Sequence, residues 1–267
     1  MPAKPSRVNC LAGGDVICKK EVVMRLVYIY HSGFAIEAEG FSLLFDYFKE
    51  SDPDPAKGYV HTRLLRRDGP LYVFASHFHP DHFNPQVLTW RERKADISYL
   101  FSRDILKRKR AKAEDATYLR KGETYADARL KVTACGSTDV GVSFLVELNG
   151  LRIFHAGDLN NWHWEEESTP EEIAQMEGDF KKELNDLAQL APRLDLAMFP
   201  VDPRMGGDFM RGARQFLDRI PTRCFVPMHF WAQPQKVAPF GAYAESKGSR
   251  FVLLGEPGED YELRIKD

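Results

Sequence analysis

The decisive stretch of this sequence is His77-Phe78-His79-Pro80-Asp81-His82, in which four of six side chains can bind a metal ion. Imidazole nitrogens and carboxylate oxygens both suit zinc and its neighbours among the divalent metals. The apolar residues 71–76 before it predict a buried strand, and Pro80 predicts the turn that ends this strand. We therefore expect the four side chains on a loop at the carboxyl end of a strand, where a rigid sheet holds them.

Three later strands are also predicted to end in side chains that can carry chemistry. One ends at His155-Ala156-Gly157-Asp158, another at Asp202, and a third at His229. An α/β scaffold places such strand ends along one edge of its sheets. The sequence therefore predicts one site built from several strands.

Turn and capping residues locate other elements. Residues 34–46 and 142–155 each predict a hairpin; the first ends at Asp46, and Asp158 follows the second. Residues 104–113 predict a short basic helix. A longer helix is predicted to start at a capping box formed by Thr169 and Glu172, with Pro170 at the first helical position.

Composition limits the classes of function. The chain has 267 residues, with 43% hydrophobic and 28% charged side chains, which is typical of a soluble globular protein. No linker divides residues 24–267, so we expect a single domain there. Residues 1–23 form either an extension before a natural start at Met24 or an ordinary N-terminal arm. The net charge of −2 gives no electrostatic reason for a nucleic-acid partner, and no apolar run is long enough to span a membrane. The four scattered cysteines favour a reducing cytoplasm.

These motifs, in this order, resemble the metallo-β-lactamase superfamily of metallohydrolases over about residues 25–235. Within it, the chain looks most like the branch that includes ascorbate-6-phosphate lactonase. The resemblance implies an α/β fold, a four-layer αβ/βα sandwich, and two divalent metal ions. It implies two ligand sets joined by a bridge: His77 and His79 for the first metal, Asp81, His82 and His229 for the second, and Asp158 between them.

The chain departs from the family at one ligand. The family usually supplies a third histidine to the first metal, but no histidine occurs between His82 and His155. Asp139 is the one carboxylate in residues 135–141, a stretch without histidine, and we predict that it takes this place, directly or through a water. A carboxylate there would favour manganese or iron over zinc. The alternative is that Asp139 caps a turn and that the first site is weak or empty.

Five further residues are predicted either to support a metal ligand or to contact the substrate. Arg204 could bind a phosphate or carboxylate group, and His163, between two tryptophans, could line the pocket. Each also has a structural interpretation, such as a turn cap for Asp202 or a buried, hydrogen-bonded imidazole for His31. The five are His31, His155, His163, Asp202 and Arg204.

The sequence thus predicts a metal-dependent hydrolase that uses a metal-bound hydroxide on a lactone, another ester or a phosphodiester. Asp81 is predicted to orient the attacking water and relay a proton, and Asp158 to bridge the metals, which would be zinc, manganese or iron. The alternative is a degenerate protein that binds metal or ligand without turnover. We expect a small-molecule substrate and no nucleic-acid or membrane partner, while the sequence defines no oligomeric state.

Overall fold

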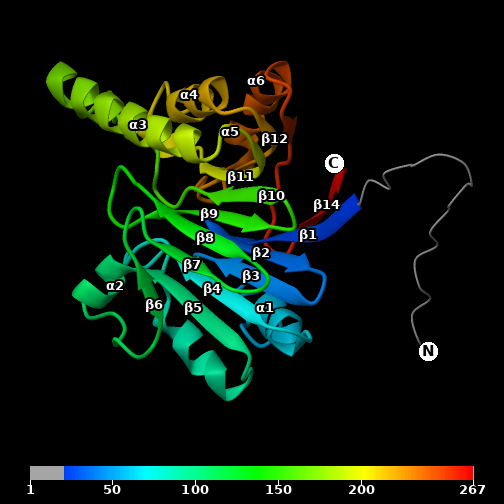
Figure 1. The fold of residues 1–267 in the computed structure, drawn as a ribbon. Helices are drawn as coiled ribbons and strands as arrows, with labels where there is room; N and C mark the ends of the chain where they lie inside the picture. Colours follow the sequence, from blue (N-terminus) through cyan, green and yellow to red (C-terminus); the bar gives the residue numbers. More distant parts are fainter. Residues whose placement is uncertain (1–20, 267) are drawn as a thin grey trace, which may run out of the picture.

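The computed structural model describes residues 21–266, which form two facing sheets with helices outside them (Figure 1). The first sheet contains β1 (Glu21–Tyr30), β2 (Gly33–Ala38), β3 (Phe41–Phe45), β4 (Leu71–Ala75), β5 (Ile97–Ser102), β6 (Thr117–Leu119) and β14 (Asp260–Lys266). The second contains β7 (Thr124–Ala126), β8 (Lys131–Cys135), β9 (Ser143–Leu148), β10 (Leu151–His155), β11 (Leu194–Pro200), β12 (Thr222–Met228) and β13 (Arg250–Phe251).

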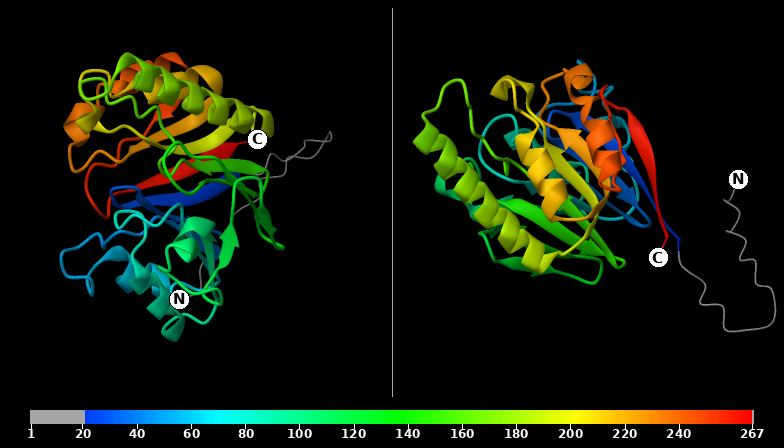
Figure 2. Two further views of the ribbon diagram at one scale, coloured as in Figure 1. Left: turned by 90° about the vertical axis from the view of Figure 1, so that its left-hand side faces the viewer. Right: turned by 90° about the horizontal axis from the view of Figure 1, so that it is seen from above.

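Helices cover the outer face of each sheet (Figures 1 and 2). The second sheet is covered by α3 (Pro170–Leu190), α4 (Arg211–Arg219), α5 (Pro234–Val237) and α6 (Phe240–Ser246). The first carries α1 (Tyr59–Thr62), α2 (Arg103–Lys107) and the 3-10 turns η1 (Leu64–Arg66) and η2 (Pro85–Glu92). This arrangement confirms the predicted αβ/βα sandwich.

Strand β1 shows how alternation of side chains builds the layers. Leu26 and Tyr28 belong to the large core cluster that also includes the second sheet, whereas Val27 and Ile29 belong to the cluster on the outer side of the first sheet. Successive side chains of a strand point to opposite faces, so an apolar strand of this kind is buried from both sides. Apolar burial of this extent is the main favourable contribution to folding.

Parallel pairing decides which strand ends meet. β3 pairs in parallel with β4, and β11 pairs in parallel with both β10 and β12. Parallel neighbours end at the same edge of a sheet. The loops after β3 and β4 therefore lie at one edge of the first sheet, and the loops after β10, β11 and β12 lie at one edge of the second. The predicted metal-binding motif follows β4, Asp158 follows β10, and His229 follows β12.

Most predicted elements are confirmed. The two hairpins are β2–β3 and β9–β10, and Asn149 and Gly150 both have a positive φ in the second turn. Thr169 and Glu172 form the predicted capping box at the start of α3. The basic helix is shorter than predicted, because α2 ends at Lys107 and Lys109 has a φ of 55°. A run of like charges contributes little to helix stability.

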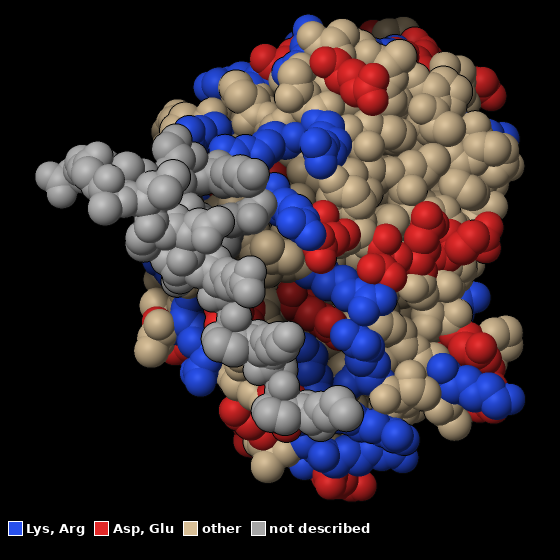
Figure 3. All heavy atoms as spheres, turned by 90° about the vertical axis from the view of Figure 1, so that its right-hand side faces the viewer, with Lys and Arg blue, Asp and Glu red and all other residues tan. Residues whose placement is uncertain are grey.

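Strands β1 and β14 pair at one edge of the first sheet, and β1 includes the last residues of the predicted N-terminal arm. Residues 1–20 of the proposed extension lie outside the described residues, while residues 21–23 belong to β1 and pair with β14. Figure 3 shows positive and negative side chains intermixed on this side of the molecule. Between β1 and β14, Arg25 contacts Asp260 at 2.7 Å. Among residues 21–266, no helix combines the length and apolarity that a membrane span requires.

Candidate metal centre

Histidine and aspartate side chains from both sheets gather where the parallel strands end. The structure brings them together in two groups, in each of which the candidate ligand atoms lie within 4.8 Å of one another. One group contains His77, His79, Asp139 and Asp158, and the other contains His31, Asp81, His82 and His229. Asp139 therefore lies where the sequence predicted a replacement for the missing histidine, and His31 joins the second group.

Asp158 lies between the two groups. Its Oδ2 is 3.4 Å from His77 Nε2, whereas its Oδ1 is 3.2 Å from His82 Nε2 and 3.5 Å from His229 Nε2. The two oxygens of one carboxylate thus face different groups. This arrangement suits a carboxylate that bridges two metal ions.

Buried hydrogen bonds fix which nitrogen of each histidine faces the centre. His82 Nδ1 lies 2.7 Å from Asp46 Oδ2, and His229 Nδ1 lies 2.9 Å from Asp202 Oδ2. These carboxylates accept the Nδ1–H proton and leave Nε2 as the acceptor that turns towards Asp158. His77 follows the same plan, because its Nδ1 is 2.9 Å from Ser76 Oγ, which donates to Asp46 at 2.6 Å.

The inward-facing atoms fit divalent metal ions. Among the described residues, Nε2 of His77, His82 and His229 and Oδ1 of Asp158 are buried without a hydrogen-bond partner. Leaving such atoms unpaired costs about 1–3 kcal/mol each. Neutral imidazole nitrogens and carboxylate oxygens are the donor set of zinc, manganese and iron sites, so cations bound to the two groups would satisfy all four atoms.

The shifts in the pKa values of the side chains at the centre also favour a bound cation. Burial and the neighbouring His82 lower the pKa of His77 to about 3, so its ring is neutral and available as a ligand. Burial and the nearby Asp158 carboxylate raise the pKa of Asp139. Burial opposes the charged form of His82, but Asp158 and Asp46 outweigh it and raise the pKa of that ring. A cation would relieve the repulsion between the two aspartates and take the place of the proton on His82.

Asp202 has two roles in the structure. Its Oδ1 caps the turn η3 (Pro203–Met205) by accepting from Arg204 N, and its Oδ2 accepts from His229. Although burial favours protonation, the hydrogen bonds from His229 and Arg204 hold the pKa of Asp202 at about 2. Both interpretations that the sequence offered for Asp202, a turn cap and a support for a ligand, agree with these contacts.

Changing Asp202 to Asn should weaken metal binding by about 10–100-fold, because Asn can keep the turn but cannot supply a negative partner for His229 Nδ1. Calorimetric titration of the metal-free protein with zinc measures this effect. Asp208→Asn is the matched control, since Asp208 contacts Arg211 and Arg214 and does not touch His229. Equal affinity in the two variants would contradict the role assigned to Asp202.

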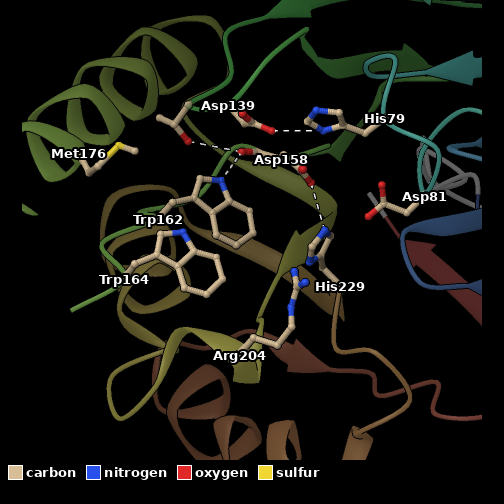
Figure 4. Close-up of a pocket in the computed structure, with 10 residues that line it drawn as sticks. His79, Asp81, Asp139, Asp158, Trp162, Trp164, Met176, Arg204 and His229 are labelled. Atoms are coloured by element: carbon tan, nitrogen blue, oxygen red, sulfur yellow. Dashed lines mark hydrogen bonds and ion pairs between the residues drawn. The ribbon is translucent and has the colours of Figure 1, made fainter. Parts of the chain in front are cut away.

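A cavity of about 300 Å³ opens beside the two groups (Figure 4). Trp162, Trp164 and Met176 line one part of it, and Asp81, Asp139 and Asp158 line the metal-facing part. Arg204 also lines the cavity, with its guanidinium carbon 4.7 Å from the centre of the Trp231 ring and an ion pair to Asp202. The cavity therefore combines aromatic walls with one arginine.

Two of the candidate histidines do not reach this cavity. Of the two interpretations of His163, the structural one agrees with its contacts: the side chain is fully buried, its Nε2 lies 3.1 Å from Asp208 O, and its Nδ1 accepts from Glu165 N. His155 is also fully buried, and its Nε2 lies 2.8 Å from Ser32 O, which ties the second sheet to the turn after β1. Both imidazoles are used for packing and hydrogen bonding.

Sequence reasoning missed the support supplied by Asp46 and Ser76. Asp46 follows β3, is fully buried, and accepts hydrogen bonds from Ser76 N and Ser76 Oγ as well as from His82. The sequence feature that could have indicated Asp46 is the similarity of the two predicted hairpins, because each of them leads into an aspartate. That likeness gave no indication of which histidine Asp46 would contact.

Fold and centre together define an αβ/βα sandwich protein with a candidate binuclear metal site. The chain belongs to the beta-lactamase superfamily, because the model of the beta-lactamase superfamily domain matches residues 25–176, more than half of its length. This confirms the resemblance seen in the sequence at the level of the superfamily. The likeness to the lactonase branch stays a prediction.

Relatives and solved structures resemble the chain over most of its length. A metal-dependent hydrolase of Carboxydothermus hydrogenoformans is 22% identical over 253 residues, which cover 88% of this chain and 98% of the relative. The metallo hydrolase Igni18 of Ignicoccus hospitalis has a TM-score of 0.64 at 18% identity, covering 91% of this chain and all of that one. CmlA, a diiron beta-hydroxylase of Streptomyces venezuelae, has a TM-score of 0.62 at 14% identity and covers 91% of this chain and 54% of its own.

Proposed function

We propose that this protein is a metal-dependent hydrolase with two divalent cations, which cleaves a small-molecule lactone, another ester or a phosphodiester. The observation that carries the proposal is the placement of Asp158, whose two carboxylate oxygens face two separate groups of ligand-type side chains. The names of relatives such as the Carboxydothermus metal-dependent hydrolase support the reaction class.

The proposal assigns the first cation to His77, His79, Asp139 and Asp158, and the second to Asp81, His82, His229 and Asp158. Cations held there would lower the pKa of a bound water and polarise the oxygen of the scissile carbonyl or phosphoryl group. The first set contains two carboxylates, so it favours manganese or iron more than a set with three imidazoles would.

The chain's own groups position the reactants. Asp81 lines the cavity with about a quarter of its side chain exposed (24%), so its carboxylate can orient the attacking water and accept the proton that this water loses. Arg204 is held by Asp202 and lies over Trp231, which leaves part of its guanidinium for an anionic group of the substrate. The tryptophan walls favour a substrate with an apolar or planar portion.

Metal content measured by inductively coupled plasma mass spectrometry, together with a screen of lactones, esters and phosphodiesters, tests this proposal. About two equivalents per chain and metal-dependent cleavage of one substrate class would support it. Bound metal without turnover of any class would favour the degenerate binding protein. No retained metal after reloading would refute both the hydrolase and its two-cation site.

Asp139 is tested by a pair of substitutions. Asp139→Ala should lower the metal content from about two equivalents towards one, because one ligand of the first group is lost. Asp139→His restores the ligand that is usual in the superfamily, and it should keep both equivalents while shifting the preference from manganese or iron towards zinc. Metal content in competition between manganese and zinc measures the shift. If the Asp139→Ala protein kept its full metal content, Asp139 would not be a metal ligand.

A further inference from the structure

His31 is the buried imidazole in this region whose ring has no hydrogen bond at all among the described residues. Its side chain is fully buried, and neither Nδ1 nor Nε2 makes a hydrogen bond. The other buried rings nearby differ, because His82 and His229 each contact a carboxylate through Nδ1, and His155 contacts Ser32 O. A buried polar group left unpaired needs an explanation, since it destabilises the fold by about 1–3 kcal/mol.

The backbone of His31 adopts a strained conformation, which adds to the free-energy cost of burying its ring. His31 has a φ of 60° in the turn between β1 and β2, a conformation that glycine adopts more easily than histidine. Its N–H donates to Tyr28 Oη at 2.8 Å, and its carbonyl accepts from His229 N at 3.3 Å. The ring lies between His229 and Trp231, with centroid distances of 4.0 and 4.1 Å. The turn is therefore fixed to the loop that carries His229.

The surroundings of the ring set it apart from the residues that line the cavity. His31 is fully buried and does not line the cavity, which Asp81 and His229 do. Its Nε2 instead lies 3.4 Å from Asp81 Oδ2, and it shares a group of candidate ligand atoms with Asp81, His82 and His229. The ring thus lies beside the second cation position without lining the cavity.

We propose that His31 is an additional ligand of the second cation, which makes that position a site of three imidazoles and the Asp81 carboxylate beside the bridging Asp158. The two positions then differ in kind: the second is rich in nitrogen and favours zinc or cobalt, whereas the first has two imidazoles and two carboxylates and favours harder metals. This inference rests on the two-cation site proposed above.

Titration of the metal-free protein with Co²⁺, followed by calorimetry and by visible absorption, tests the inference without any substrate. The wild type should bind two equivalents with unequal affinity. His31→Phe keeps a ring between His229 and Trp231 but removes both nitrogens, so it should weaken the tighter event by about 10–100-fold, change its absorption, and spare the weaker event. Asp139→Ala should do the reverse.

Stability of the metal-free variants provides the folding control. Phe in place of a buried imidazole that makes no hydrogen bond should leave the melting temperature close to that of the wild type, because a polar group without a hydrogen bond is removed. His31→Asn, which tolerates the positive φ, serves if the Phe ring does not fit. A His31→Phe or His31→Asn protein that is folded and titrates like the wild type would overturn the inference alone. A wild type that binds no cobalt would overturn the two-cation site as well.

Discussion

Replacing Asp158 with Asn should remove most of the bound metal and lower kcat/KM for the hydrolysed substrate by about 10³-fold or more. The carboxylate faces both groups of ligands, so its loss weakens both positions at once. Metal ions contribute several kcal/mol to stabilising such transition states, and each 1.36 kcal/mol corresponds to a factor of about ten. Metal content and steady-state kinetics on the same preparation measure the two effects.

Two controls show whether the loss comes from the bridge. Asp218→Asn changes an exposed aspartate that contacts Lys247, so metal content and activity should stay as in the wild type. Asp139→Asn alters one ligand of the first group only, and it should cost less metal than Asp158→Asn does. Retention of both equivalents by Asp158→Asn would contradict the assignment of Asp158 as the bridge.

Changing Gly141 to Ala should destabilise the metal-free protein by about 3 kcal/mol or more. Gly141 has a φ of 80°, and a Cβ there would lie 2.1 Å from Ser76 O and 2.5 Å from His77 Cβ. A left-handed non-glycine residue costs about 1–3 kcal/mol, and forcing atoms into a packed region typically adds 1–3 kcal/mol. The loop cannot simply move away, because Val142 N donates to Ser76 O at 2.9 Å.

The same substitution should also weaken metal binding. Gly141 is two residues from Asp139, and its added Cβ would press on His77, so both ligands of the first group would be displaced. Urea unfolding of the metal-free protein and metal content of the loaded protein measure the two effects separately. Gly150→Ala is a matched control, because Gly150 also has a φ of 80°, but a Cβ added there would meet no atom within 4 Å. It should show the left-handed cost alone, about 1–2 kcal/mol, with unchanged metal content. Similar losses in both variants would show that the close approach to Ser76 is unimportant.

Local sequence was sufficient to locate the ligand-bearing loops. A metal-binding motif after an apolar run, an Asn-Gly turn before β10 and a capping box at α3 are each encoded within a few residues, and the structure has the corresponding elements. The position of Asp139 was also inferable, because histidine is absent from the stretch that usually supplies the ligand. Its approach to His79, 3.4 Å between Asp139 Oδ2 and His79 Nδ1, agrees with that inference.

Contacts between distant segments were not predictable in the same way. Asp46 and His82 are 36 positions apart, and an aspartate at the end of a strand is as typical of a turn as of a support for a ligand. His163 lies between two tryptophans that do line the cavity, yet its own ring turns towards Asp208 and Glu165. Which way a ring points depends on packing across the fold, and neighbours along the chain do not reveal it.

The ligands come from both halves of the sandwich, and this has a mechanical consequence. His77 and His82 follow β4 of the first sheet, whereas Asp158 and His229 follow β10 and β12 of the second. A cation held among them would act as a cross-link between two layers that also meet through the apolar core and through polar contacts such as His155 Nε2 with Ser32 O. The free energy of metal binding would then add to the cohesion of the sheets, so the edge of the sandwich where the cavity opens would also be the edge that a bound metal holds together.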